Sequence, residues 1–503
     1  MAKSDSSDSS AGRLVKHSSI YAIGNSARQL VGFLMLPLYT HYLTPADYGV
    51  VGLLTFALAL LEPFFGARLG DAMLKFYYEA TEEAQKRLVI STSLVITGGV
   101  STIVATIAFL ARAPASELIF GTAQYALPVG LMSYVFVSQA LESYGLTYVR
   151  IRRKPILFIS VNLSKLVLQL SLNIWFIVYL QLGITGVVLS GVISSGLYAL
   201  GLSLYSIYYN GATCDIRIAK RMLVFSWPLW ISSLASLYIY SSNRYYIRIF
   251  GSMEQVGYYE LAARFAGLLG VVIWQPISQF WETERFRYYQ QPHGKTVFSS
   301  VFEFSSLALF VGALGISIFS EPTIQFMAAP PFHDASLLVP LLAFGWLFGY
   351  LTLFTNFSFL VTEKTVLISR NNYITVAIIT ALNFILVPKF GYLGAGCAQL
   401  LALFLQFLLV RASARPHYDM GLRLLPFLAM VGISAGGYLL ANRLLHISWE
   451  PLDLLWKAFI CAVTAAALLG VVLISAPNRT QFVRLLDSLV YPLMRKLRLL
   501  PQS

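Results

Sequence analysis

Long apolar stretches alternate with short polar ones from one end of the chain to the other. A stretch of about twenty apolar residues is what an α-helix needs to cross the hydrocarbon core of a bilayer. About fourteen such stretches occur, at 17–40, 48–66, 88–111, 122–143, 155–180, 184–208, 222–248, 256–281, 297–319, 336–360, 366–387, 392–411, 424–441 and 454–475. The polar connections are too short to fold separately. The pattern predicts an all-α integral membrane protein.

Lysine and arginine fall mainly on one side of these predicted spans. With the N-terminus in the cytoplasm, 27 basic residues lie on the cytoplasmic side, and only Arg112, Arg248, Lys389 and Arg443 lie on the other. Short loops rich in Lys and Arg stay in the cytoplasm. We therefore expect an even number of spans, with both termini cytoplasmic.

The two ends of the chain differ in character. Residues 1–16 are rich in Ser and Asp and are expected to form a disordered cytoplasmic tail. They do not have the pattern of a cleavable signal peptide. Residues 478–500 carry leucines at helical spacing with interspersed Arg and Lys, which predicts a basic amphipathic helix on the cytoplasmic membrane surface.

A weak internal repeat relates the two halves of the chain. Leu43–Gly49, between spans one and two, corresponds to Gly251–Gly257, between spans seven and eight. Six spans separate the copies, so both run in the same direction across the membrane. Parallel repeats imply two lobes with substrate bound between them. The predicted parts are an N-lobe at 17–208, a cytoplasmic linker at 209–221, a C-lobe at 222–411 and a further pair of spans at 424–475.

Composition excludes several classes of function. The chain is 57% hydrophobic and 12% charged, and its net charge of +13 follows from the basic cytoplasmic loops, so we expect no nucleic-acid partner. Its three cysteines and six histidines show no metal-binding spacing, and neither a metal nor another cofactor is expected. The short external connections carry no paired carboxylates, so a membrane glycosyltransferase or polymerase is not expected.

Several short motifs resemble those of a known family. Ser18–Gly24, Phe33–Tyr39 and Tyr42–Gly49 resemble the start of the polysaccharide biosynthesis flippases. Asn243–Ile247 and Val256–Tyr259 are similar to that family's mid-chain signature. These proteins are the O-antigen and exopolysaccharide repeat-unit translocases of the multidrug/oligosaccharidyl-lipid/polysaccharide exporter superfamily. The resemblance covers the whole chain in span number and spacing.

The resemblance implies both a fold and a cargo. The fold would be a fourteen-span, two-lobe bundle related to the multidrug exporters and to the lipid II flippase. The cargo would be an undecaprenyl-diphosphate-linked oligosaccharide, moved from the cytoplasmic to the outer face of the bacterial inner membrane. Partners would then include membrane lipids and the polysaccharide polymerase and assembly machinery.

Polar and charged side chains lie within the apolar spans. Placing a charge at membrane depth costs at least a few kcal/mol, so we interpret these side chains as the lining of a hydrated cavity. The predicted cavity residues are Asn25, Arg28 and Gln29 in span one, Tyr240, Asn243 and Arg244 in span seven, and Arg264 and Gln275 in span eight. Guanidinium groups suit a diphosphate because they stay charged and donate two parallel hydrogen bonds.

Other charged residues have two interpretations each. Glu62, Glu142, Lys165 and Glu260 are candidates for a coupling proton or for interhelical ion pairs, and Glu260 could neutralise Arg264 four residues later. Arg68 and Asp71 are candidates for a cytoplasmic gate or for side chains that reach the interface. A drug or metabolite exporter of the same superfamily is the alternative function.

Overall fold

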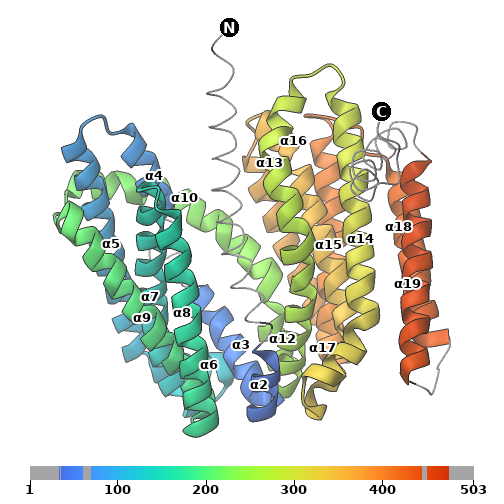
Figure 1. Cartoon of the computed structure of the whole chain (residues 1–503), viewed down its shortest axis with the longest axis horizontal. Helices are drawn as coiled ribbons and strands as arrows, with labels where there is room; N and C mark the ends of the chain where they lie inside the picture. The colour runs from blue at the N-terminus through green and yellow to red at the C-terminus, as the bar shows by residue number, and fades with distance from the viewer. Residues whose placement is uncertain (1–32, 34, 61–68, 445–449, 475–503) are drawn as a thin grey trace, which may run out of the picture. The chain divides into compact units, whose positions relative to one another are not determined.

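The computed structural model describes residues 33, 35–60, 69–444 and 450–474, which form helices and short turns without a strand (Figure 1). The first elements are α2 (Leu36–Tyr42), α3 (Pro45–Ala59), α4 (Leu69–Glu79), α5 (Glu83–Leu110), α6 (Arg112–Phe120), η2 (Ala123–Tyr125), α7 (Ala126–Ile151), α8 (Pro155–Ile174), η3 (Trp175–Tyr179), α9 (Gly183–Asn210), α10 (Ile216–Ser241) and α11 (Asn243–Phe250). The others are α12 (Met253–Leu268), η4 (Leu269–Trp274), α13 (Gln275–Tyr289), α14 (Gly294–Met327), η5 (Pro330–Leu337), α15 (Val339–Thr355), α16 (Phe357–Val361), α17 (Val366–Ala414), α18 (Leu424–Leu439), η6 (Leu440–Leu444) and α19 (Glu450–Leu473).

The long helices occupy the predicted spans. Within the described residues, nine helices are long and apolar enough to cross a membrane, and each overlaps a predicted stretch. The prediction of an all-α membrane protein is confirmed. The count of fourteen stays a prediction, because most of the first span lies outside the described residues. The same holds for the predicted tail at 1–16 and the amphipathic helix at 478–500.

The longest helix, α17, contains two predicted spans. Gly391, at φ 55° and ψ −135°, interrupts its helical backbone. The Asn371 amide donates to the Ser413 hydroxyl at 3.0 Å, and the Gln406 amide donates to Asn372 at 3.0 Å. These bonds join the two ends of α17 side by side. The break at Gly391 therefore folds the segment back as a hairpin, as predicted for spans at 366–387 and 392–411.

The chain divides into two compact units. Unit 1 contains the residues up to Leu261, together with Met327–Asp334 and Thr380–Ala395. Unit 2 contains Ala262–Phe326, Ala335–Ile379 and the residues from Gly396 onward. The predicted lobe boundaries at 208 and 222 stay predictions.

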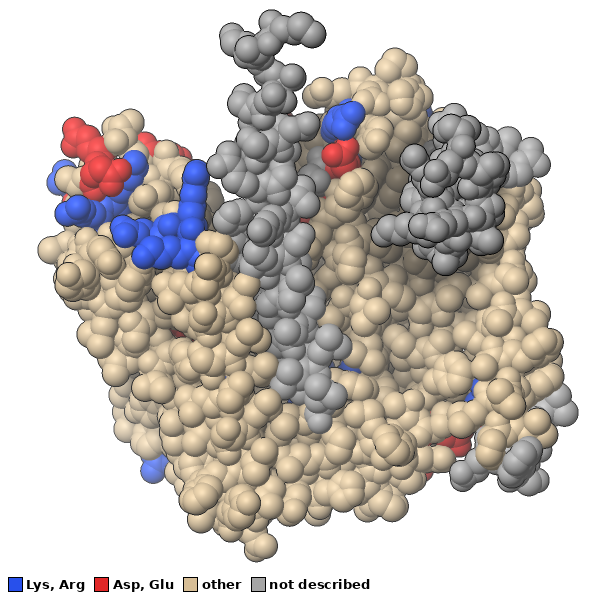
Figure 2. Space-filling model, viewed as in Figure 1, with Lys and Arg blue, Asp and Glu red and all other residues tan. Residues whose placement is uncertain are grey.

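The core of unit 1 joins α4, α5, α7 and α10. Its fully buried members include Met73, Ile90, Tyr148 and Met222. Tyr144 donates its buried hydroxyl to the Ile90 carbonyl at 3.0 Å, so the polar atom is satisfied within the core. Most charged side chains visible on unit 1 gather at one end of its helices, and the flanks are largely uncharged (Figure 2). Such a distribution suits helices that cross a bilayer.

In unit 2, the α18–α19 pair docks on α14 at two levels. Near one end of α14, Arg423 donates to both oxygens of Glu303 at 2.7 and 2.6 Å, and Glu303 is only 2% exposed. Near the other end, Lys457 lies 3.7 Å from Glu321 and 2.8 Å from Asp453. Glu303 and Glu321 are about 27 Å apart along a helix. Apolar residues fill the space between: Leu314, Ile318, Ala441 and Ile460.

Replacing Arg423 with glutamine is expected to loosen this docking. The substitution removes the positive charge and the two hydrogen bonds that Arg423 provides to the buried Glu303 carboxylate, which costs about 1–3 kcal/mol. Thermal unfolding of the purified protein should show a lower midpoint. Arg415→Gln is the matched control, because Arg415 is exposed and forms no ion pair within the described residues. Equal midpoints for the two variants would contradict the proposed docking role.

Candidate functional site

The first turns of α3 and α12 contact each other through backbone. Gly49 and Gly257 are the fifth residues of these helices, which begin at Pro45 and Met253. A Cβ on Gly49 would lie 2.8 Å from the Gly257 amide nitrogen and overlap the Met253 carbonyl oxygen. A Cβ on Gly257 would lie 2.7 Å from the Pro45 carbonyl carbon and overlap its oxygen. Each glycine therefore packs against the first residue of the other helix. We call this the reciprocal glycine contact.

Matching caps start the two helices. Thr44 and Asp47 exchange hydrogen bonds: the Asp47 amide donates to the Thr44 hydroxyl at 3.1 Å, and Thr44 donates to the Asp47 carboxylate at 2.7 Å. In α12 the Gln255 amide donates to the Ser252 hydroxyl at 3.3 Å. Both are variants of the capping box, with the cap residue three positions before its partner. The internal repeat thus encodes the same helix start twice, with a glycine two positions after each partner.

The reciprocal glycine contact lies at the end of unit 1 away from the basic linker. The α10–α11 segment begins at that linker and ends at Phe250, just before α12. Tyr48 and Val256, which precede the two glycines, are buried at 3% and 0% exposure. Tyr48 also packs edge-on against Phe332, with ring centroids 5.8 Å apart. Because backbone meets backbone here, the packing leaves no room for a side chain at either glycine.

Buried amides join α11 to its neighbours beside this contact. The Asn383 amide donates to the Asn243 side-chain oxygen at 2.7 Å, and the Asn243 amide donates to the Tyr259 hydroxyl at 3.0 Å. Asn243, Tyr259 and Asn383 are all fully buried. In the described structure, the predicted cavity residue Asn243 therefore bridges α12 and α17.

An ion pair lies one turn further along α12. The Arg244 guanidinium donates through Nε to one oxygen of Glu260 and through Nη2 to the other at 3.4 Å. The two side chains are 13% and 12% exposed. Arg244 also lies over the Tyr259 ring, with its Cζ 5.2 Å from the centroid. A Cβ on Gly52 of α3 would overlap the Glu260 side chain, so α3 also packs closely on this pair.

A second pair of predicted residues forms a separate ion pair. Lys165 on α8 lies 2.5 Å from Glu142 on α7, and their side chains are 13% and 5% exposed. Of the two interpretations of Glu142, Lys165 and Glu260, the geometry agrees with interhelical ion pairs. Both pairs are nearly buried, and removing one partner from such a pair costs more than the pair itself contributes.

The other predicted site residues fall in different places. Asn25, Arg28, Gln29, Glu62 and Arg68 lie outside the described residues. Tyr240 is half-buried on α10. Asp71 is exposed in the first turn of α4. Arg264 and Gln275 belong to unit 2. The convergence of Arg28, Arg244 and Arg264 on one cavity stays a prediction.

Sequence reasoning missed two kinds of residue. Glu303 and Lys457 lie in predicted spans at 297–319 and 454–475, and a search of every span for charges would have identified both. Gly49 and Gly257 were aligned in the internal repeat, but nothing in one sequence indicates that the two copies touch. Among the described residues, no group of His, Cys, Asp and Glu could hold a metal ion.

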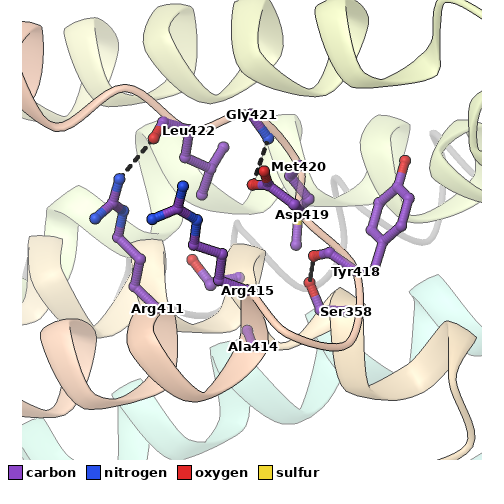
Figure 3. A pocket seen from close by; sticks show the side chains of 10 residues that line it. Ser358, Arg411, Ala414, Arg415, Tyr418, Asp419, Met420, Gly421 and Leu422 are labelled. Carbon is purple, nitrogen blue, oxygen red and sulfur yellow. Dashed lines mark hydrogen bonds between the residues drawn. The ribbon is translucent and has the colours of Figure 1, made fainter.

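A polar cavity of about 250 Å³ lies in unit 2 at the end of α17 (Figure 3). Arg411 in the last turn of α17 and Arg415 just after the helix point into it, and the segment from Tyr418 to Leu422 borders it. Arg411 donates to the Leu422 carbonyl at 2.6 Å. The Asp419 carboxylate, which accepts from the Gly421 amide at 3.1 Å, offsets one of the two positive charges. None of the predicted site residues lines this cavity.

Comparison with known proteins decides the family. The family model described as "Polysaccharide biosynthesis protein" matches residues 14–280, which is more than half of the chain. The chain belongs to this family. No curated protein sequence matches it.

Solved structures share the fold of this polysaccharide biosynthesis protein. The structure titled "Lipid II flippase MurJ, inward closed conformation" matches with a TM-score of 0.71 and 14% identity, covering 89% of this chain and 98% of that one. An inward-facing multidrug resistance MATE transporter of the MOP superfamily matches at 0.57 and 16%, covering 77% and 95%. A mutant of the Vibrio cholerae MATE transporter VcmN matches at 0.53 and 15%, covering 82% and 98%. The predicted relationship to multidrug exporters and the lipid II flippase is confirmed at the level of fold.

Proposed function

We propose that this protein is a flippase for an undecaprenyl-diphosphate-linked oligosaccharide. It moves the headgroup from the cytoplasmic to the outer face of the bacterial inner membrane, and both of its termini are cytoplasmic. Membership in the polysaccharide biosynthesis family supports the cargo class. The proposal involves transport without any bond being made or broken.

The reciprocal glycine contact is the observation that carries the transport mechanism. It joins the two copies of the internal repeat at the end of unit 1 opposite the basic linker, which is the outer side in the proposed orientation. At the two glycines no side chain interlocks the helix starts, so the helices can separate at this contact. Alternating access requires an outer barrier of this kind, closed while the cargo enters and open while it leaves.

Charged groups behind this barrier suit an anionic cargo. The Arg244–Glu260 pair lies on the neighbouring turn, and its side chains keep a little exposure. An incoming diphosphate would compete with Glu260 for the guanidinium, because both are oxyanions that accept parallel hydrogen bonds from arginine. Binding of the headgroup to Arg244 on α11 would thereby release Glu260 on α12.

Deleting the gene tests the proposed cargo. We expect lipid-linked oligosaccharide to accumulate on the cytoplasmic face and the exported polysaccharide to be lost, with both restored by the intact gene. Purified protein in vesicles should also move the labelled lipid-linked oligosaccharide between leaflets. If those vesicles instead exported a cationic dye and left the lipid in place, the drug-exporter alternative would be correct.

A further inference from the structure

A basic groove of about 580 Å³ lies on unit 1 where α4 meets the start of α10. Four basic residues border it, and they contribute mainly the apolar parts of their side chains to its surface: Lys75, Arg217, Lys220 and Arg221. Its apolar lining consists of Phe76, Val224 and Phe225. On α10 the lining residues are spaced by three or four positions, so they form one stripe along the helix. These seven residues are here called the basic groove.

Aromatic rings hold two of the cations in place. The Lys75 ammonium lies 4.3 Å from the centroid of the Phe225 ring, and the Arg221 guanidinium lies 4.8 Å from that of Phe76. The rings of Phe76 and Phe225 pack edge-to-face, with centroids 6.1 Å apart. Rings that are packed against each other restrict the cations above them. Part of the entropy of ordering these long side chains is therefore lost before any ligand arrives.

Carboxylates compensate this positive charge only in part. Glu79 lies 3.8 Å from Lys75 and 3.9 Å from Arg221, and all three side chains are at least 44% exposed. Exposed pairs of this kind contribute little. Neither Arg217 nor Lys220 forms an ion pair in the described part of the chain. The exposed basic side chains around the groove therefore carry excess positive charge.

Basic residues at the start of α10 are unfavourable for the helix itself. A helix N-terminus favours anions, yet no acidic residue lies in the first turn of α10 and Arg217 does. Asp215 caps the helix by accepting from the amides of Arg217 and Ile218 at 2.7 and 3.1 Å. Hydrogen bonds from the Ile218 and Arg217 amides hold the pKa of Asp215 below its usual value, so it stays ionised at the cap. An external anion would compensate the side chains that Asp215 does not reach.

The groove continues into an apolar surface of α10. Val224 is 66% exposed and Trp227 is 52% exposed, on the side toward the middle of the predicted span. From Arg217 to Trp227 the helix rises about 15 Å. A ligand that follows the helix would meet cations first and apolar side chains afterwards. Tryptophan is itself enriched at the membrane interface.

We infer that the basic groove binds an anionic phospholipid of the leaflet adjoining the basic loops. The phosphate lies at the edge of the groove, among the exposed side chains of Lys75, Lys220 and Arg221, and an acyl chain runs along Val224 and Trp227. Basic pockets between helices on the cytoplasmic side bind such headgroups in other membrane proteins. The inference rests on the proposed orientation, which places this end of unit 1 in the cytoplasm, and is independent of the proposed cargo. The start of α10 belongs to the predicted linker between the lobes, so the bound lipid would contact that linker.

Lipid binding to the full-length purified protein tests the inference. Native mass spectrometry would count phosphatidylglycerol and phosphatidylcholine bound to wild type and to Lys220→Gln/Arg221→Gln. Each cation near a membrane surface contributes about fivefold to binding of an anionic lipid. We therefore expect phosphatidylglycerol affinity to fall about 25-fold in the double variant, with phosphatidylcholine binding unchanged.

A matched variant distinguishes a site from general surface charge. Arg87→Gln/Arg152→Gln also removes two exposed cations from unit 1, and neither residue lines the groove. We expect it to bind phosphatidylglycerol like wild type. An equal loss in both double variants, or equal wild-type affinity for the two lipids, would overturn the inference. So would a groove variant that loses a polyprenyl diphosphate but keeps phosphatidylglycerol, which would assign the groove to the cargo. Loss of lipid binding with intact cargo flipping would leave the proposed function in place.

Discussion

Replacing Gly257 with valine is expected to block export while leaving a folded protein. The added side chain would overlap the backbone of Pro45, which cannot move aside as a flexible side chain could. Overpacking of this kind costs about 1–3 kcal/mol. It destabilises only the state in which the two helix starts are in contact. The state with α3 and α12 apart would then be favoured about 5- to 150-fold more than in wild type.

Accumulation of lipid-linked oligosaccharide measures the loss of export, and a cysteine reports the cause. Val50 on α3 is fully buried beside Gly49. In a protein whose three native cysteines are replaced, we expect Val50→Cys to resist a membrane-impermeant thiol reagent added outside. Adding Gly257→Val should make the same cysteine react.

Gly201→Val is the matched control. Gly201 lies within α9, and a Cβ there would have no neighbour within 4 Å. This variant should export normally and keep Val50→Cys protected. Because of the reciprocal geometry, Gly49→Val should behave like Gly257→Val. Normal export by either variant, or a protected cysteine in both, would show that the contact is not the outer barrier.

Replacing Glu260 with glutamine is expected to destabilise the protein more than removing the whole ion pair. The single substitution leaves the Arg244 guanidinium nearly buried without its carboxylate, which costs about 3–5 kcal/mol. In Arg244→Gln/Glu260→Gln the two amides can bond each other, and much of that stability should return. Thermal unfolding of wild type, both single variants and the double variant measures the coupling energy.

Export separates the structural role of this pair from cargo binding. If Arg244 also binds the diphosphate, the double variant regains stability but not export. Lys165→Gln/Glu142→Gln is the matched control, because it neutralises a second nearly buried pair of unit 1. We expect this control variant to regain both stability and export. Additive losses in the Arg244 and Glu260 cycle would contradict their coupling, and full export by their double variant would remove Arg244 from the binding site.

The spans could be predicted because the thickness of the bilayer sets the length of each apolar run independently of the rest of the fold. An apolar run of fixed length is visible in the sequence whatever its neighbours are, and α5, α9 and α14 each overlap a predicted span. The family could be predicted because its motifs are contiguous, as in Tyr42–Gly49. These same residues form a helix cap, which is also a local structure.

The partners of the intramembrane charges could not be predicted in the same way. Glu260 had Arg264 as a candidate partner by helical spacing, and the structure pairs Glu260 with Arg244 from the preceding helix. Glu303 pairs with Arg423, which is 120 residues away. A single sequence does not show which distant residues come together, because that depends on how the helices pack. The sequence also showed each glycine only as part of a repeat.

The sequence by itself determined that long apolar helices recur along the chain, which connections carry the basic residues, and that two copies of one helix start occur. Each of these depends only on a short stretch of residues and on whether that stretch lies in lipid or in water. Tertiary structure alone decided that the two helix starts touch through Gly49 and Gly257 and that Arg244 lies against Glu260. Close packing of backbone and pairing of buried charges depend on atoms from distant parts of the chain, so they exist only once the helices are in place.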